Sequence, residues 1–360
     1  MDGRTLARWR LHTLGLAGRP FASPEAVVRG LLAVQAEIRP QAAWAVATRT
    51  TGVTEPDMEL LLDAGTILRT HVLRATWHFV LPDDIRWLLE LTAPRLRRTW
   101  QSLQQQLATS DDQLERSRTV LVEALTAEGP LTRGALAQHL GDAGVPAEGQ
   151  RLGLVLGDAE LEALICSGPG ETYALLADRA PAARRLQRDA ALAEIALRYC
   201  TGHGPATERD LGYWATLTVT DVRRGLAAVA DRLQRFECDG RTYWAADDPP
   251  HDVGRLQPRA HLLQILDEYY RGYQHSRDLL DLAGIVPAGR LPDVGMVLVD
   301  GQMVGGMRRE LLGSGVRFTV RPYRSLDAGE RTLIVDAAER YAAFLGRTAE
   351  VAYAGAYASA

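Results

Sequence analysis

Residues 129–170 read GPLTRGALAQHLGDAGVPAEGQRLGLVLGDAELEALICSGPG, and the order of elements in this stretch decides the fold. A short helix, RGALAQHL, precedes the turn GDAGVP and a longer helix, EGQRLGLVLGDAELEALI. A hairpin then reverses at Ser167-Gly168-Pro169-Gly170, because glycine and proline favour a tight turn. A short helix, a longer helix and a β-hairpin in this order are the plan of a winged helix.

The same plan recurs further along the chain. GPATE at 204–208 echoes GPLTR at 129–133 and leads into ERDLGYWA, a helix starting near Thr218, and the run RFECDGRTYWA. Asp239-Gly240 divides that run into two apolar-alternating halves, which is a strong hairpin signal. A five-residue echo alone is weak evidence of a repeat, but the recurrence of the whole order of elements makes a chance match less credible.

The N-terminal region follows this order too. Ser23-Pro24-Glu25 supplies a cap residue, a first-turn proline and an acid, so a helix should run from here to about Val34. Further helices are expected from about Gln41 and over EPDMELLLDAG, before the β-rich runs ILRTHVL and TWHFV. The chain therefore reads as three tandem winged-helix units.

Long helices are expected between these units, over roughly 82–107, 111–127 and 181–200. After Asp247-Asp248-Pro249-Pro250 the pattern changes to strand-like runs, VGMVLVDGQMVGGMRREL and VRFTVRPY, with a turn at Asp300-Gly301. A last helix near 327–346 precedes a short strand, EVAYA. The fold class predicted is mainly α with β-hairpin wings (α+β), plus a small C-terminal β-rich module. The predicted domains are winged-helix units at 1–110, 111–180 and 181–250, and the C-terminal module at 251–360.

Composition narrows the classes of function. The 360 residues are 46% hydrophobic and 24% charged, which is typical of a globular protein. No apolar run approaches the roughly 18 residues that span a bilayer, and Arg8, Arg10 and His12 interrupt any signal-peptide core. We therefore expect a cytoplasmic protein without a membrane partner. The net charge of −4 counts mildly against nucleic acid, but all 41 basic residues are arginines, whose planar fork suits phosphate.

Signals for a cofactor or a metal are missing from the sequence. There is no P-loop or GxGxxG fingerprint, and Gly313-Ser314-Gly315 is too short for a nucleophile elbow. The eight histidines form no HExxH or close ligand pair. Cys166, Cys200 and Cys238 are odd in number and far apart, so they are expected to be buried apolar side chains. We expect neither metal nor cofactor.

One polar pair interrupts an apolar helix. The apolar stripe that reaches Leu32 should continue three residues later with another apolar side chain. That position is Gln35 instead, and Glu37 follows two residues after it. Pro40 disfavours helical geometry just before it, so the chain should turn here. In an extended chain, side chains at i and i+2 point the same way, and Gln35 and Glu37 would face one small volume. In the alternative, Gln35 caps the helix end and Glu37 is solvated.

Several stretches resemble the AlkZ/YcaQ-type bacterial DNA glycosylases. They are VQAEIRPQAAWAVATR, LRTHVLRATWHFVLPDDIRWLL, LEALICSGP, HLLQILDEYYRGYQHSRDLL and VDGQMVGGMRREL. The resemblance covers nearly the whole chain. It implies tandem winged helices in a C-shaped arrangement and excision of N7-alkylated guanine from double-stranded DNA. Some members unhook interstrand crosslinks, and some protect producers of DNA-alkylating natural products.

The resemblance also names catalytic residues. The family motif is Gln, an apolar residue, and then Gln or Asp; this sequence matches at Gln35 and Ala36 and departs at Glu37. An N7-alkylguanine is cationic and leaves as a neutral base, so its departure needs no general acid. The Glu37 carboxylate would stabilise the oxocarbenium-like sugar and orient a water, and Gln35 would position the same water or the sugar.

DNA-contacting residues follow from the same resemblance. Arg74, Thr76 and His78 in RATWH match a family motif on the first wing, and they either touch DNA or hold the wing by hydrogen bonds. Arg308 and Arg309 follow a hairpin and either reach a groove or lie on a solvated strand edge. The DEYYRGY stretch is expected to brace the C-terminal module.

These observations predict a monomeric, monofunctional DNA glycosylase, a hydrolase of N-glycosyl bonds that serves DNA repair or antibiotic self-resistance. The rival is a non-catalytic winged-helix DNA-binding protein, either a transcription regulator or a lesion-sequestering resistance protein. The long helix of the second unit, GLVLGDAELEALI, is apolar or acidic and poorly suited to reading base edges, which counts against the regulator.

Overall fold

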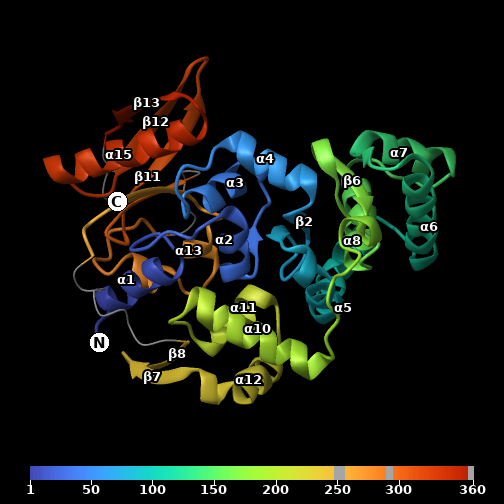
Figure 1. The fold of residues 1–360 in the computed structure, drawn as a ribbon, viewed down its shortest axis with the longest axis horizontal. Coiled ribbons are helices and arrows are strands. Elements are labelled where there is room, and N and C mark those ends of the chain that lie inside the picture. The colour runs from blue at the N-terminus through green and yellow to red at the C-terminus, as the bar shows by residue number, and fades with distance from the viewer. Residues whose placement is uncertain (247–255, 289–294, 356–360) are drawn as a thin grey trace. The chain divides into compact units, whose positions relative to one another are not determined.

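The computed structural model describes residues 1–246, 256–288 and 295–355 (Figure 1). Helices and several small sheets form two compact units. The first unit comprises Met1–Met58, Leu197–Leu211 and Val229–Ala360, and the second comprises Glu59–Ala196 and Gly212–Ala228. No helix in the described ranges is long and apolar enough to cross a membrane. Residues 247–250, after which the sequence pattern changes, lie outside the described residues.

The second unit contains the stretch that decided the fold. Its elements after the long helix α5 (Pro82–Gln106) are α6 (Asp111–Glu128), β4 (Leu131–Thr132), α7 (Arg133–Asp142), α8 (Gly149–Leu161), β5 (Ile165–Ser167), the one-turn η1 (Pro169–Glu171), β6 (Thr172–Leu175) and α9 (Leu176–Arg179). The three strands form a sheet in the order β4-β6-β5. Leucines from α6, α7 and α8 meet in one buried cluster with Ile165. The order of elements predicted from 129–175 is confirmed.

Two more hairpins were predicted correctly. In the second unit, β2 (Leu68–His71) pairs antiparallel with β3 (Trp77–Val80), after helix α4 (Glu55–Ala64). In the first unit, β7 (Gln234–Cys238) pairs with β8 (Arg241–Ala245). Asp239 and Gly240 between them both have positive φ, at 49° and 72°, as a two-residue hairpin turn requires.

The helices around the β7–β8 hairpin show one correction. They are α10 (Arg188–His203), α11 (Glu208–Ala215), α12 (Val219–Ala228) and the short η2 (Ala230–Arg232). The helix predicted over 181–200 begins only at Arg188. Pro181 disfavours helical geometry at the residue before it. Arg184 then holds the non-helical segment, because its guanidinium donates to Asp84 at 2.6 Å and its N–H to the Asp83 carbonyl.

The C-terminal part of the first unit is a five-stranded sheet. Its strands are β9 (Ala260–Gln264), β10 (Gly295–Val299), β11 (Gln302–Leu311), β12 (Gly315–Pro322) and β13 (Thr348–Tyr353), in the order β13-β12-β11-β10-β9. Neighbours pair antiparallel, except that β13 lies parallel to β12. Helix α15 (Ala328–Phe344) makes that crossover and packs on the sheet (Figure 1). The β-rich module is confirmed, but the sequence analysis did not identify β9.

The N-terminal helices of the first unit are α1 (Gly3–Thr13), α2 (Pro24–Leu31) and α3 (Arg39–Ala47), and two short helices, α13 (Glu268–Arg271) and α14 (Arg277–Leu280), lie later in the chain. Helix α2 is three residues shorter than predicted. Helix α3 starts two residues before the predicted Gln41, because Pro40 is tolerated in a first turn. The chain does turn between these two helices.

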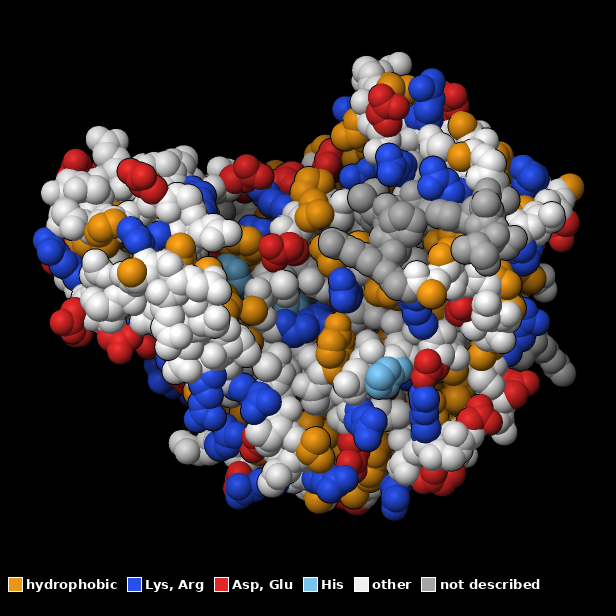
Figure 2. All heavy atoms as spheres, turned by 180° about the vertical axis from the view of Figure 1, so that it is seen from behind, with side chains coloured by type: hydrophobic (Ala, Val, Ile, Leu, Met, Phe, Trp, Pro, Cys, Tyr) orange, Lys and Arg blue, Asp and Glu red, His pale blue; other side chains and the backbone are white. Residues whose placement is uncertain are grey.

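Charged side chains of both signs are interspersed over the face seen in Figure 2, where every blue side chain is an arginine. Part of the arginine set is engaged inside the protein, as Arg10 and Arg49 are both buried. A net charge of −4 therefore does not describe the local charge at any one site.

Candidate functional site

Gln35 lies on a two-residue strand, β1 (Val34–Gln35), in the first unit. Helix α2 ends because Leu32 has a φ of +65°, outside the helical range. The chain is extended from there to Gln35, whose side chain is buried at 7% exposure. Gln35 therefore does not cap the helix, and the extended alternative describes its backbone.

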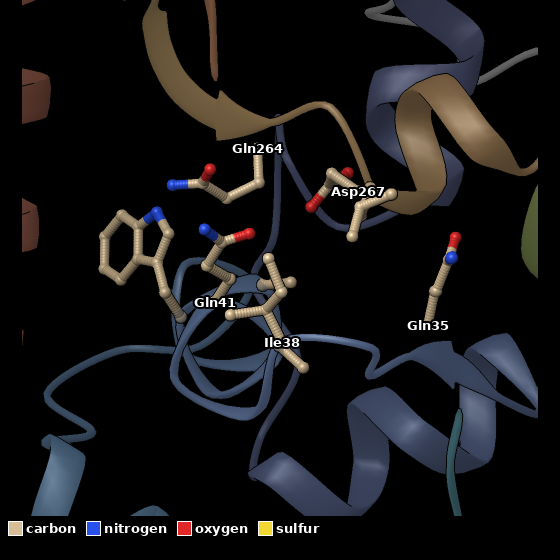
Figure 3. Close-up of a pocket in the computed structure, with 9 residues that line it drawn as sticks. Gln35, Ile38, Gln41, Gln264 and Asp267 are labelled. Atoms are coloured by element: carbon tan, nitrogen blue, oxygen red, sulfur yellow. The ribbon is translucent and has the colours of Figure 1, made fainter. Parts of the chain in front are cut away.

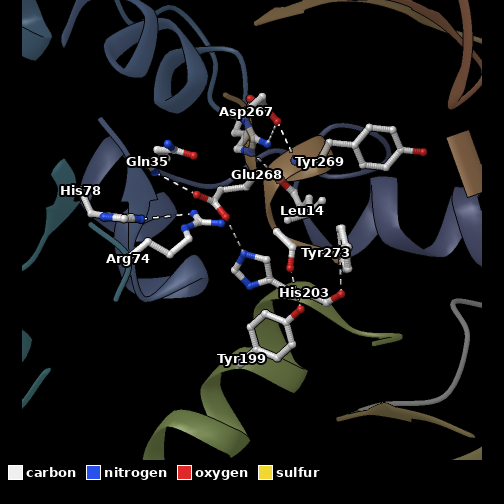
Figure 4. A network of polar contacts seen from close by, with 12 residues as sticks. Leu14, Gln35, Arg74, His78, Tyr199, His203, Asp267, Glu268, Tyr269 and Tyr273 are labelled. Carbon is white, nitrogen blue, oxygen red and sulfur yellow. Dashed lines mark hydrogen bonds and ion pairs between the residues drawn. The ribbon is translucent and has the colours of Figure 1, made fainter. Parts of the chain in front are cut away.

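The backbone of Gln35 is held by a buried carboxylate. Its N–H donates to Oε1 of Glu268 at 2.8 Å, and Glu268 has no solvent exposure (Figure 4). The other carboxylate oxygen, Oε2, lies 3.3 Å from Nε2 of His203, at the end of α10. One carboxylate thus joins the candidate catalytic strand to a helix that ends 168 residues later in the sequence.

Two tyrosines fix His203. The Tyr199 ring stacks on the imidazole at 4.8 Å between centroids, and the Tyr273 hydroxyl donates to the His203 carbonyl at 2.8 Å (Figure 4). Burial raises the pKa of both tyrosines well above the usual range, so both hydroxyls stay protonated and donate. A Cβ on Gly272 would come 2.9 Å from the His203 ring, so glycine is needed here.

A second buried pair, Arg49 and Asp267, supports the same region. The guanidinium donates to both oxygens of Asp267, at 2.7 and 2.9 Å, and Arg49 is fully buried. It also donates to the carbonyls of Leu14 and Ala45. Asp267 in turn caps α13 by accepting the N–H of Tyr269 at 2.8 Å, which places Glu268 in the first turn of that helix.

A hollow of about 290 Å³, including the part open to solvent, lies beside this network. Its lining comes from β1, the start of α3 and the end of β9, and consists of Gln35, Ile38, Gln41, Ala42, Trp44, Ala45, Gln264, Leu266 and Asp267. Figure 3 shows the Gln41 and Gln264 amides facing one another beside an indole ring. Buried Oε1 atoms of Gln35 and Gln264 have no hydrogen-bond partner.

Glu37, the second predicted catalytic residue, is exposed. The strand ends at Gln35 and the chain bends at Glu37 and Ile38 before α3, so strand alternation does not extend to Glu37. The structure therefore gives the two side chains different environments, one buried and one solvated.

Arg74, Thr76 and His78 lie on the β2–β3 hairpin of the second unit and contact one another. Arg74 donates to Nε2 of His78 at 3.2 Å, and Nδ1 of His78 lies 3.0 Å from the Thr76 carbonyl. Because a guanidinium can only donate, Nε2 of His78 is the acceptor of this contact. The Arg74 guanidinium also lies 5.8 Å from the Tyr213 ring. These contacts hold the wing, and a DNA contact by the same residues stays a prediction.

Arg308 and Arg309 are neighbours on β11 and differ in environment. Arg308 is exposed, opposite Thr319 on β12. Arg309 donates to the Tyr341 hydroxyl and lies 5.0 Å from that ring, which ties it to α15. Arg308 is thus better placed than Arg309 to reach a separate molecule, and the DNA contacts predicted for both remain untested.

Comparison with known proteins decides the family. The model of the family described as DNA glycosylase AlkZ-like matches residues 28–344. The chain belongs to the AlkZ-like DNA glycosylase family. A solved structure, DNA glycosylase AlkZ from Streptomyces sahachiroi, matches 98% of this chain and 99% of its own with a TM-score of 0.78. The identity is 20%, so this likeness shows the shared fold. A comparison with curated protein sequences gave no match.

Membership of the AlkZ-like family makes DNA the substrate and base excision in DNA repair the activity. A DNA glycosylase breaks the bond between a base and its sugar, and its site must place polar groups against a sugar that becomes cationic. In the first unit of this AlkZ-like chain, Gln35 and three further amide or carboxylate side chains, Gln41, Gln264 and Asp267, line the hollow, and Glu37 is not part of the lining. Within the described residues, no three His, Cys, Asp or Glu side chains are grouped to hold a metal ion.

Part of this AlkZ-like site was not predicted from the sequence. DEYYRGY was expected to brace the C-terminal module, and its Tyr269 does donate to the Gly301 carbonyl of that module at 3.1 Å, but its Glu268 accepts the backbone N–H of Gln35 on the candidate catalytic strand. His203, Gln41 and Gln264 were not singled out. A single histidine at a helix end carries no spacing signal, and β9, which positions Gln264, was not predicted. The only usable signal was the run of acids and tyrosines after a buried segment.

Proposed function

We propose that this protein is a monofunctional DNA glycosylase that hydrolyses the N-glycosidic bond of N7-alkylguanine, including bulky natural-product adducts or interstrand crosslinks. It acts as a monomer on double-stranded DNA in the bacterial cytoplasm, in repair or in self-resistance. The observation that carries the proposal is Gln35-Ala36-Glu37, a near match to the family motif, in a chain of the AlkZ-like family.

The chemistry suits these residues. Alkylation at N7 puts a positive charge on the guanine, which is lost when the base departs. The charge then develops on the sugar at C1′, where the exposed Glu37 carboxylate stabilises it and orients a water for attack. Assistance by a general base contributes roughly 10²–10⁴-fold. Gln35 adds a positioned amide, because Glu268 fixes its backbone.

The arrangement of elements supports a DNA-binding scaffold. The helix–strand–helix–helix–hairpin order of residues 111–175, with its β4-β6-β5 sheet, matches a winged helix. We extend the proposal to three such units in tandem, the others containing the β2–β3 and β7–β8 hairpins. Arg74 and Arg308 would then provide phosphate contacts, which set affinity and its salt dependence.

The test is base release from duplex DNA carrying N7-alkylguanine, by wild type and by Glu37→Ala. Glu37 is exposed, so the variant should fold normally. We expect release by the wild type and a loss of at least 100-fold in the variant. Glu115→Ala, which removes an exposed carboxylate on α6, is the matched control and should keep full activity. Equal activity in wild type and Glu37→Ala would contradict the catalytic assignment.

The rival proposal is a lesion-sequestering protein. It is favoured by the extra methylene of Glu37 relative to the family's Asp and by the burial of Gln35. It predicts tight binding of alkylated DNA without an abasic product. Heating the product in alkali cleaves DNA at abasic sites, so a gel separates the two proposals.

A further inference from the structure

Among the side chains of the hollow that have no part in the proposed chemistry are Gln41, Trp44 and Gln264. Gln264 ends strand β9, and Gln41 and Trp44 lie on α3. The Trp44 ring is fixed because its indole N–H donates to the Leu262 carbonyl at 3.2 Å. Figure 3 shows that the two amides face each other beside this ring, so the hollow has one flat apolar wall and a polar end.

The charge of the lining excludes one class of ligand. None of the nine lining residues is an arginine or histidine, and the one acid, Asp267, has both oxygens engaged by Arg49. Phosphate binding in proteins relies on cations or on clustered N–H donors. The hollow is therefore not built for the DNA backbone, and the group it takes must come from the base or from what is attached to it.

Size narrows the ligand further. Pockets that enclose a drug-sized ligand measure about 300–1,000 Å³. The space inside this hollow that a water molecule can occupy is about 10 Å³, which is room for about one water-sized group. Ile38, which is 45% exposed, adds an apolar side chain to the lining. A small group fits such a space better than a whole nucleoside.

The polar end of the hollow contains acceptors that can receive a hydrogen bond from a ligand. Gln264 is 4% exposed and its Oε1 has no partner. A buried acceptor without a partner is energetically unfavourable, and a hydrogen bond from a ligand hydroxyl or amine would remove that penalty. The Oε1 of Gln35, next to the same hollow, is in the same state. The lining thus combines an apolar wall with acceptors.

We propose that this hollow binds the substituent carried on N7 of the lesion, and that Gln264 accepts a hydrogen bond from a hydroxyl or amine on that substituent. The inference rests on the proposed glycosylase function. N7 is separated from the glycosidic nitrogen by a single carbon, so a group that projects from N7 lies close to the bond that Gln35 and Glu37 act on. It also projects from the duplex in the major groove, without base flipping.

The test compares two lesions that differ in one donor. Duplexes carry 7-methylguanine or 7-(2-hydroxyethyl)guanine on a 2′-fluoro sugar, which resists cleavage, and Kd is measured by fluorescence anisotropy. Wild type should bind the hydroxyethyl lesion about fivefold to tenfold more tightly, the effect of one net hydrogen bond. Gln264→Met keeps the side-chain length and removes the acceptor, so it should abolish this preference and leave 7-methylguanine binding unchanged.

Two further variants complete the test. Gln105→Met, on an exposed part of α5, should retain the preference. Gln41→Met changes a half-buried position and should reduce the preference even if Gln264→Met does not fold. No preference in the wild type would overturn the inference. So would an equal loss of affinity for both lesions in Gln264→Met, since the hollow would then support the motif or the base rather than read the substituent.

Base release from the same lesions on ordinary deoxyribose separates this inference from the function on which it rests. A wild type that prefers the hydroxyethyl lesion but releases neither base would contradict the glycosylase proposal and leave substituent recognition standing. A wild type that releases both bases but shows no preference in binding would contradict substituent recognition and leave the glycosylase proposal standing.

Discussion

Each unit of this molecule contains a buried histidine–glutamate pair, and the two pairs serve different ends. In the second unit, Nδ1 of His71 contacts Glu160, whose other oxygen accepts the Trp77 indole N–H at 3.3 Å. In the first unit, His203 contacts Glu268, whose other oxygen accepts the Gln35 backbone N–H. All four side chains of the two pairs are buried.

The difference lies in the third partner. Glu160 accepts the Trp77 indole N–H and the His71 backbone N–H, and the Trp77 ring packs on the His71 ring at 4.1 Å, so these contacts lie at the turn end of the β2–β3 hairpin. One carboxylate oxygen of Glu268 accepts the backbone N–H of Gln35, a candidate catalytic residue. The same chemistry therefore stabilises the β2–β3 hairpin in one unit and holds the candidate catalytic strand in the other. Removing each carboxylate tests this contrast.

Glu268→Ala should have the largest effect. It leaves the Gln35 N–H and the His203 ring without their buried acceptor, at about 1–3 kcal/mol for each donor. We expect the free energy of unfolding to fall accordingly and base release by the folded protein to drop at least tenfold. The measurements are urea unfolding and single-turnover base release.

Glu268→Gln is the control for that prediction. Its amide oxygen can still accept the Gln35 N–H, so base release should stay within about threefold of wild type. A Glu268→Ala protein that is destabilised but fully active per folded molecule would show that Glu268 is structural only.

Glu160→Ala should destabilise to a similar extent and leave catalysis alone. The variant removes the acceptor of both the His71 and Trp77 rings, with a cost of about 1–3 kcal/mol for each buried donor. Base release per folded molecule should match wild type at a temperature well below the unfolding midpoint. A tenfold drop there would erase the contrast between the two pairs.

The smallest expected effect is local opening of each region, which is measured by the reactivity of buried cysteines. Cys200 lies one helical turn before His203, and Cys166 lies on β5 near Glu160; burial raises the pKa of both thiols to about 12. Iodoacetamide at pH 8 should therefore modify neither in wild type within minutes. We expect Glu268→Ala to speed modification of Cys200 severalfold, and Glu160→Ala that of Cys166, by mass spectrometry. Equal acceleration at both cysteines in either variant would indicate global unfolding instead.

The elements that the sequence predicted well carry local signals. Ser23 caps α2 and Pro24 begins it, and Asp239-Gly240 and Asp300-Gly301 form turns with positive φ at both residues. Each signal depends on a few neighbouring residues, whose backbone preferences survive in the folded chain. The early end of α2 lacked such a signal, because Leu32 adopts positive φ without being glycine or asparagine.

The candidate site was predictable only in part for the same reason. Gln35 and Glu37 were found because they break a periodic pattern and resemble a family motif. The partner of Gln35 lies 233 residues away, and no periodicity links the two. Gln264 belongs to the site because β9 lies in the sheet and contacts α3, and β9 was not predicted from the sequence. Burial, which makes both residues informative, is a tertiary property.

The long reach of the Gln35–Glu268 bond has a consequence for synthesis on the ribosome. The first unit is assembled from three separate segments of the chain, and the candidate catalytic strand belongs to the earliest of them. A nascent chain exposes Gln35 long before residue 268 leaves the ribosome. Because contacts between distant residues form late and slowly, the site is completed only near the end of translation. A chain truncated before that point would carry the motif without the acceptor that positions it.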